Sequence, residues 1–191
     1  MGVIVEKIVG WNKVVNSART TVGKDSIKKD PSEAFKKKIL TSEHSPIRKL
    51  LFDITWENIP YWVAMHIRTH HVGFKSADDD LYFIETQRSD RTQTDRDELP
   101  QTAEVALNIQ INAQAMINVS RVRLCRQAST ETRAAWIEML NEIQKIEPIL
   151  YSLCIPNCVY RNGLCQETTN CCGYNKKPAF KIALEDYVRL F

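Results

Sequence analysis

The pattern of apolar residues between Pro100 and Pro148 constrains the fold most. Apolar side chains recur at helical spacing from Pro100, a residue suited to the first position of a helix, to about Leu124. A second helix is expected after Ser129, which can cap it, and Pro148 ends or kinks that helix. Two long helices need an apolar surface to pack against, which favours a sheet behind them. The two apolar stripes are Val105, Ile109, Met116 and Val119, and Trp136, Met139, Leu140, Ile143 and Ile146.

The first 70 residues supply candidates for that sheet. Residues 3–9 and 49–56 predict strands, because both are short apolar runs rich in strand-forming residues. Asp30 is the expected cap of a short helix between them, and residues 58–60 open another helix that runs to about Thr69. The predicted class is therefore α+β, with a mixed or antiparallel sheet packed against long helices.

Length and composition predict one domain over residues 1–191. A chain of 22.0 kDa buries enough apolar surface to fold without disulfides. No apolar run approaches the length that crosses a bilayer, and the first residues lack a secretory signal, so we expect a cytoplasmic protein. The net charge is only +3, and a solvated helix face explains the local basic patch better than nucleic-acid binding does. The patch comprises Lys28, Lys29, Lys36, Lys37 and Lys38.

The segment 72–98 is the strongest candidate for function. It is long and polar, and it contains the stretch Gln87-Arg88-Ser89-Asp90-Arg91. Arginine binds phosphate with two parallel hydrogen bonds, and a serine two residues earlier supplies further donors. Ser89 and Arg91 are therefore suited to a nucleotide phosphate, although ordinary solvated loop residues have the same composition.

This stretch, together with Arg68 and residues 112–123, resembles the flavin-dependent thymidylate synthases. The signature of that family runs Arg-His-Arg, two variable residues, Ser, variable, Asn-Glu, variable, Ser, variable, Arg-Tyr. Here Arg68 stands at the first Arg, Gln87 at the Glu, and Ser89 and Arg91 at the later Ser and Arg. Further matches in the same order are Ser17-Ala18-Arg19-Thr20, His44-Ser45-Pro46, Asn112, Asn118, Arg123 and residues 128–133.

The resemblance implies an enzyme that converts dUMP to dTMP by reductive methylation. It implies FAD as cofactor, NADPH and methylenetetrahydrofolate as co-substrates, and a homotetramer whose active sites are shared between subunits. The catalytic residues implied are Arg123, which polarises the uracil ring, and Ser89. The residues implied for dUMP are Gln87, Ser89, Arg91 and Arg123, and those implied for FAD are Arg68, His70, Ser45, Asn112, Gln114 and Asn118.

Several positions depart from the family pattern. Thr69 replaces a His, Gln87 replaces the Glu, Gln114 replaces an Arg, and residues 75–84 form an insertion with three consecutive acids. Two alternatives therefore stay open: a nucleotide-binding or nucleotide-sensing protein without flavin chemistry, and a related flavoenzyme that acts on another pyrimidine nucleotide. A third reading treats Arg123 simply as one half of a surface ion pair with an acid of the next helix.

Histidines and cysteines raise the question of a metal. His66, His70 and His71 lie near one helix end, but two adjacent histidines without a third placed ligand are typical of surface residues or of hydrogen-bonded core residues. Five of the six cysteines crowd residues 154–172, and their spacing lacks the paired Cys-x2-Cys of common zinc sites. We expect reduced thiols that pack a tail. Structural zinc is the weaker alternative, with Cys154, Cys158, Cys165 and Cys171 as its ligands.

Overall fold

The computed structural model describes residues 2–70, 83–88 and 96–191. Within these ranges, none of the helices has the length and apolarity needed to cross a membrane. The elements in chain order are β1 (Gly2–Val9), α1 (Trp11–Thr20), α2 (Glu33–Thr41), η1 (Ser45–Lys49), β2 (Leu51–Pro60), α3 (Tyr61–Arg68), β3 (Phe83–Thr86), η4 (Arg96–Glu98), β4 (Glu104–Asn112), α4 (Ala113–Arg123), α5 (Thr130–Ile146), α6 (Pro148–Leu153), α7 (Asn157–Tyr160), η5 (Tyr174–Lys176) and α8 (Pro178–Val188).

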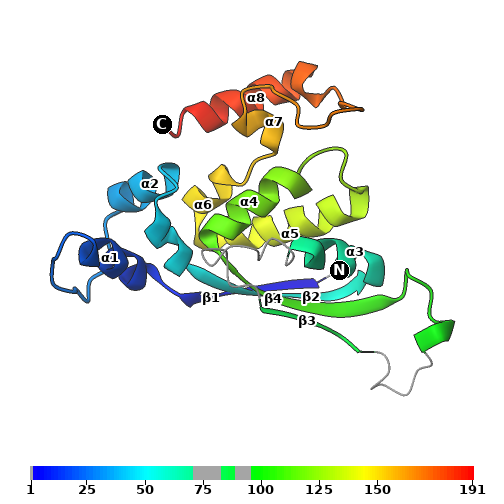
Figure 1. The fold of residues 1–191 in the computed structure, drawn as a ribbon, viewed down its shortest axis with the longest axis horizontal. Coiled ribbons are helices and arrows are strands. Elements are labelled where there is room, and N and C mark those ends of the chain that lie inside the picture. The colour runs from blue at the N-terminus through cyan, green and yellow to red at the C-terminus, as the bar shows by residue number, and fades with distance from the viewer. Residues whose placement is uncertain (1, 71–82, 89–95) are drawn as a thin grey trace.

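The described strands form one antiparallel sheet in the order β1-β2-β4-β3. Helices α4, α5 and α6 cover one face of this sheet, and α7 and α8 lie beyond them, farther from the strands (Figure 1). Side chains that alternate along β2 and β4 face these helices and are buried, as a one-sided antiparallel sheet requires. The α+β class predicted from the sequence is confirmed.

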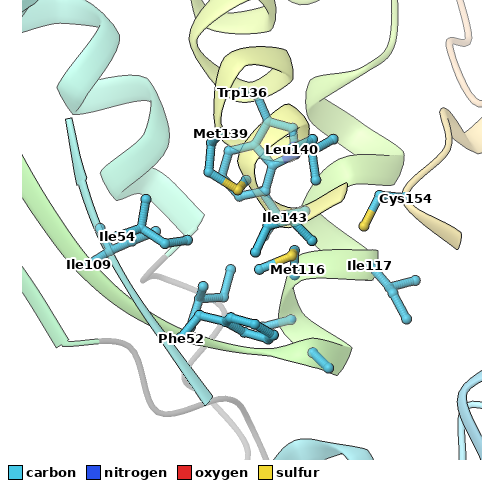
Figure 2. Packing of buried hydrophobic residues seen from close by; sticks show 14 of the residues in the cluster. Phe52, Ile54, Ile109, Met116, Ile117, Trp136, Met139, Leu140, Ile143 and Cys154 are labelled. Atoms are coloured by element: carbon cyan, nitrogen blue, oxygen red, sulfur yellow. The ribbon is translucent and has the colours of Figure 1, made fainter. Parts of the chain in front are cut away.

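The core lies between the sheet and α4 and α5. Phe52, Ile54 and Ile109 from the strands face Met116 of α4 and Trp136 of α5 (Figure 2). Two indole N–H groups are satisfied inside this core, because Trp136 donates to the Ser120 hydroxyl at 2.9 Å and Trp56 donates to the Ala135 carbonyl at 3.1 Å. These bonds tie α4 to α5 and α5 to the sheet.

The predicted helix from Pro100 to Leu124 is wrong in its first half. Residues 104–112 form β4, and only residues 113–123 form helix α4. The alternation of buried Val105, Leu107, Ile109 and Ile111 with polar neighbours has the period of a strand. Leu107 and Ile111 fall between the positions that fitted a helix, and pairing with β2 and β3 satisfies the backbone.

Other predicted elements hold with smaller changes. Both predicted strands and the helix after Ser129 are confirmed, and Pro148 begins α6 directly after α5 ends. The cap of α2 is Ser32 and not Asp30, because the Ser32 hydroxyl accepts the backbone N–H of Phe35 at 3.3 Å. The polar segment after residue 72 also contains a strand, β3, which its short apolar stretch explains.

Candidate functional site

The C-terminal ends of α3 and α4 form the centre of the candidate site. Because β2 and β4 are antiparallel neighbours, the helices that follow them start at opposite ends of the sheet and run towards each other. Helices of this length extend about 12 Å and about 16 Å, and a nine-residue strand extends about 30 Å. The two C-terminal ends therefore meet near the middle of the sheet, although they are far apart in sequence.

Arg123 joins these two ends. Its guanidinium Nη2 donates to the backbone carbonyl of His66 at 2.5 Å and to the Thr69 hydroxyl at 3.0 Å, and its Nε donates to Nε2 of His70 at 2.5 Å. The last carbonyls of a helix carry partial negative charge, which a cation stabilises. The hydrogen bonds of Arg123 thus lead to α3, a partner that the ion-pair reading of the sequence did not foresee.

His70 is neutral in this arrangement. Burial, followed by the nearby charge of Arg123, lowers the pKa of His70 to about 4. Because Nε2 accepts a hydrogen bond from Arg123, the neutral ring carries its own proton on Nδ1. The ring therefore acts as an acceptor that fixes the direction of the guanidinium.

Of the site residues predicted at the end of α3 and in the neighbouring loop, the structure also describes Arg68 and Gln87. Arg68 is exposed at the last position of α3. Gln87 extends the pairing of β3 with β4: its backbone N–H donates to the Ala106 carbonyl at 2.9 Å, and its Oε1 accepts the Ala106 N–H at 3.1 Å. Its side chain is thus engaged in the sheet edge. Ser89, Arg91, His71 and residues 75–82 of the insertion lie outside the described residues.

A polar network occupies the other side of α4. Gln114 Nε2 donates to Glu43 Oε2 at 2.7 Å and to Asn118 Oδ1 at 3.3 Å. Arg121 forms an ion pair with Glu43, donates to Asn118 Oδ1 at 3.2 Å, and lies 3.6 Å from the ring centre of Tyr160. Gln114 and Asn118 were predicted from the sequence, whereas Glu43 and Arg121 were not. The spacing of 114, 118 and 121 marks one polar stripe on α4, which is the signal that could have identified Arg121.

Asn112 and Ser45 have separate positions. Asn112 is buried and caps α4, since its Oδ1 accepts the backbone N–H of Ala115 at 2.9 Å. The whole of α4, about 16 Å, separates it from Arg123. Ser45 is exposed at the start of η1. The structure therefore brings together Arg123 with His70, and Gln114 with Asn118, but does not bring Asn112 to Arg123.

Comparisons with known proteins agree on one kind of fold. A chain of the flavin-dependent thymidylate synthase ThyX from Helicobacter pylori, in a structure complexed with FAD and dUMP, superimposes with a TM-score of 0.63 at 12% identity, covering 81% of this chain and all of that one. A UMP/dUMP methylase PolB from Streptomyces cacaoi, bound with 5-Br dUMP, gives a TM-score of 0.53 at 12% identity over 80% of this chain and 94% of that one. The architecture is thus that of the flavin-dependent thymidylate synthases.

Sequence matches point to the same family. The family model described as "Thymidylate synthase complementing protein" matches residues 86–149. A flavin-dependent thymidylate synthase from Clostridium tetani is 36% identical over 74 residues, which are 39% of this chain and 29% of that protein. One from Sulfolobus acidocaldarius is 30% identical over 69 residues, 36% of this chain and 26% of that protein. The match thus spans less than a third of either relative. Over these residues in sequence, and over most of the chain in fold, the protein is similar to the flavin-dependent thymidylate synthases, and the resemblance is confirmed.

Proposed function

We propose that the chain is an enzyme of the flavin-dependent thymidylate synthase type, which converts dUMP to dTMP by reductive methylation. FAD would be its cofactor, and NADPH and methylenetetrahydrofolate its co-substrates. The placement of Arg123 carries the proposal, because this guanidinium is held by three hydrogen bonds at the meeting point of α3 and α4. It stands at the position where the family pattern has the arginine that polarises the pyrimidine.

The contacts of Arg123 suit it to this role. A guanidinium fixed by Thr69 and His70 loses little conformational freedom when a ligand binds, which favours affinity. Its positive charge stabilises negative charge that develops on the oxygen of a uracil ring during reduction. Neutral His70 adds no second charge beside it. We propose that Ser89 and Arg91 bind the phosphate of the same nucleotide, and that Gln87 lies beside it.

The positions expected to hold FAD fit this cofactor only in part. Exposed Arg68 and Ser45 are available to anionic oxygens of a dinucleotide. Gln114 and Asn118 are hydrogen-bonded to each other, and both also bind Glu43 or Arg121, so they do not fit FAD in their present arrangement. When bound, the flavin would supply the hydride; the residues of this chain bind and orient the nucleotide.

This network favours a second candidate function. A chain that has replaced an arginine by Gln114, and has bonded that residue to Glu43, keeps the Arg123 end of the site while losing contacts on the flavin side. Such a chain would bind a pyrimidine nucleotide without flavin chemistry, as a sensor or a sequestering protein. A flavoenzyme with another pyrimidine nucleotide as substrate would share the same Arg123 end.

Three measurements on the purified full-length chain separate these functions. We expect flavin absorbance or saturable FAD binding, dUMP binding by calorimetry, and NADPH oxidation that depends on dUMP and yields dTMP with methylenetetrahydrofolate. We expect Arg123→Gln to lose dUMP affinity and Arg189→Gln, a surface control on the C-terminal helix, to retain it. Nucleotide binding without FAD binding or NADPH oxidation would establish the second function, and turnover of a different pyrimidine nucleotide would establish the third.

The absence of binding to any pyrimidine nucleotide would refute all three candidate functions. The family resemblance also leads us to propose a homotetramer. Light scattering coupled to size-exclusion chromatography would measure its mass directly.

A further inference from the structure

Five cysteines from separate parts of the chain line one small cavity. Its volume is about 10 Å³, which is room for a single water-sized atom. All six cysteines are free thiols, and the sixth, Cys154, is buried in the core and does not line this cavity. The five are Cys125 after α4, Cys158 in α7, and Cys165, Cys171 and Cys172 in the segment before η5.

The five thiols interact with one another. Cys165 and Cys171 share a hydrogen bond, and Cys125 lies close enough to both Cys158 and Cys165 to influence their ionisation electrostatically. Cys172 does the same to Cys158. These pairwise interactions connect all five sulfurs into one group, although Cys125 is 33 residues from its nearest cluster partner in the sequence.

Backbone N–H groups in this segment donate to two of the sulfurs. The N–H of Gly173 donates to the sulfur of Cys171. The N–H of Glu167 donates to the sulfur of Cys165. In both cases the donor is two residues after the cysteine. Gly173 has a φ of 71°, a left-handed conformation that suits glycine.

The segment that carries these thiols has little regular structure and little apolar packing. Between α7 and α8, residues 161–177 contain only the short η5 as regular structure, and most of their side chains are exposed. Leu164, the one large aliphatic side chain of the segment, is 63% exposed. Polar contacts, such as that of Gln127 Nε2 with the Asn170 carbonyl, and the packing of Tyr174 on Phe180 hold this segment, and a metal staple would add to them.

We propose that this cluster binds Zn²⁺ through four thiolates, Cys125, Cys158, Cys165 and one of the adjacent Cys171 and Cys172, and that the ion anchors the C-terminal tail to the end of α4. Four thiolates are a common ligand set for structural zinc, and all five cysteines are free thiols. Binding releases the thiol protons to solvent. Arg126 lines the cavity and Lys176 acts electrostatically on Cys171, so two cations balance the negative charge of the site.

The ligand set requires the thiols to move. In the described part of the chain, no three His, Cys, Asp or Glu side chains already surround one point as metal ligands do. A cysteine sulfur moves by rotation about a single bond, and structural zinc sites commonly take their final form only when the ion binds. The zinc proposal therefore rests on the shared cavity and the hydrogen-bonded thiols, and not on the present orientation of each side chain.

The zinc content of the full-length chain tests this proposal. Protein purified with a reductant and without a chelator should contain about one zinc per chain. We expect Cys158→Ser and Cys125→Ser to lose the metal and Cys154→Ala, the matched control outside the cavity, to keep it. Of Cys171→Ser and Cys172→Ser, one should keep it. Replacement by Co²⁺ should give the thiolate charge-transfer and tetrahedral absorption bands of a four-sulfur site.

A second measurement does not depend on how the variants fold. Removal of zinc from the unmodified chain by a chelator should increase proteolysis within residues 161–177, and added zinc should restore protection. The proposal is overturned if the reduced chain takes up neither Zn²⁺ nor Co²⁺. It is equally overturned if mass spectrometry of protein alkylated at lysis finds these cysteines in disulfides. Neither experiment involves a nucleotide, so their outcome is independent of the proposed enzyme activity.

Discussion

Acidification should destabilise the folded chain through His70. Burial, followed by the charge of Arg123, lowers the pKa of this residue from its usual 6.5 to about 4. At neutral pH the ring is uncharged in both the folded and the unfolded chain. Below pH 6.5 the unfolded chain binds a proton that the folded chain does not bind until the pH approaches 4. Stability is therefore lost as the pH falls through this window, and His70 causes no further loss below it.

The size of the effect follows from the gap between the two pKa values. Each pH unit of the gap corresponds to about 1.4 kcal/mol, so the upper limit is about 3 kcal/mol. The ring is only partly buried, and solvent reduces this value. We expect about 1 to 2 kcal/mol between about pH 7 and about pH 4.5. Other groups also titrate in this range, so the contribution of His70 must be taken from a difference between two chains.

Urea unfolding of the unmodified chain and of His70→Gln supplies that difference. Gln does not titrate, and its side-chain oxygen can still accept a hydrogen bond from Arg123. The free energy of unfolding should therefore fall more steeply with acid in the unmodified chain than in the variant. His44→Gln, at an exposed position, is the matched control and should follow the unmodified chain. Parallel curves for all three proteins, or an NMR titration of the His70 ring near pH 6.5, would refute the reasoning.

Three substitutions test the contacts that position the site. Asn112→Ala removes the cap of α4 and should cost about 1 kcal/mol in urea unfolding, whereas Asn112→Asp should retain most of it. Glu147→Gln weakens a buried acceptor of the Trp11 indole N–H and should cost about 1 to 2 kcal/mol; a loss that disappeared in high salt would contradict a buried contact. Trp136→Phe leaves the buried Ser120 hydroxyl without its donor and should cost about 2 to 3 kcal/mol, and adding Ser120→Ala should recover part of this.

The sequence predicted those elements whose signals are local. Ser129 caps α5, Pro148 separates α5 from α6, and the strand over 3–9 is β1, because caps, prolines and short apolar runs act within a few residues. The prediction of one helix over residues 100–124 was wrong because Pro100 and the four-residue spacing of some apolar positions both suit a helix. Residues 104–112 form a strand because β4 lies between β2 and β3 in the sheet, where every second side chain is buried.

The candidate site was predictable only at the level of single positions. The spacing of Asn118 and Arg123 on one helix could be compared with a family pattern, and both do lie on α4. Their partners could not be deduced, because Glu43 and His70 reach α4 through the pairing of strands far apart in the chain. The same limit explains Cys125, which stands alone in the sequence but lies beside the cysteines of the tail.

Arg123 and Cys125 are two residues apart, and this spacing connects the two proposed sites. The last turn of α4 carries Arg123 to the end of α3, and the chain immediately after it carries Cys125 to the cysteine cluster. An ion bound by Cys125 would restrict the backbone that also positions the guanidinium. On the opposite side of α4, Arg121 is held between Glu43 and the ring of Tyr160 in the tail helix α7. The tail therefore contacts the chain on both sides of Arg123, at Arg121 and at Cys125. A C-terminal segment outside the family-matched region thus has a physical means to shape the proposed nucleotide site.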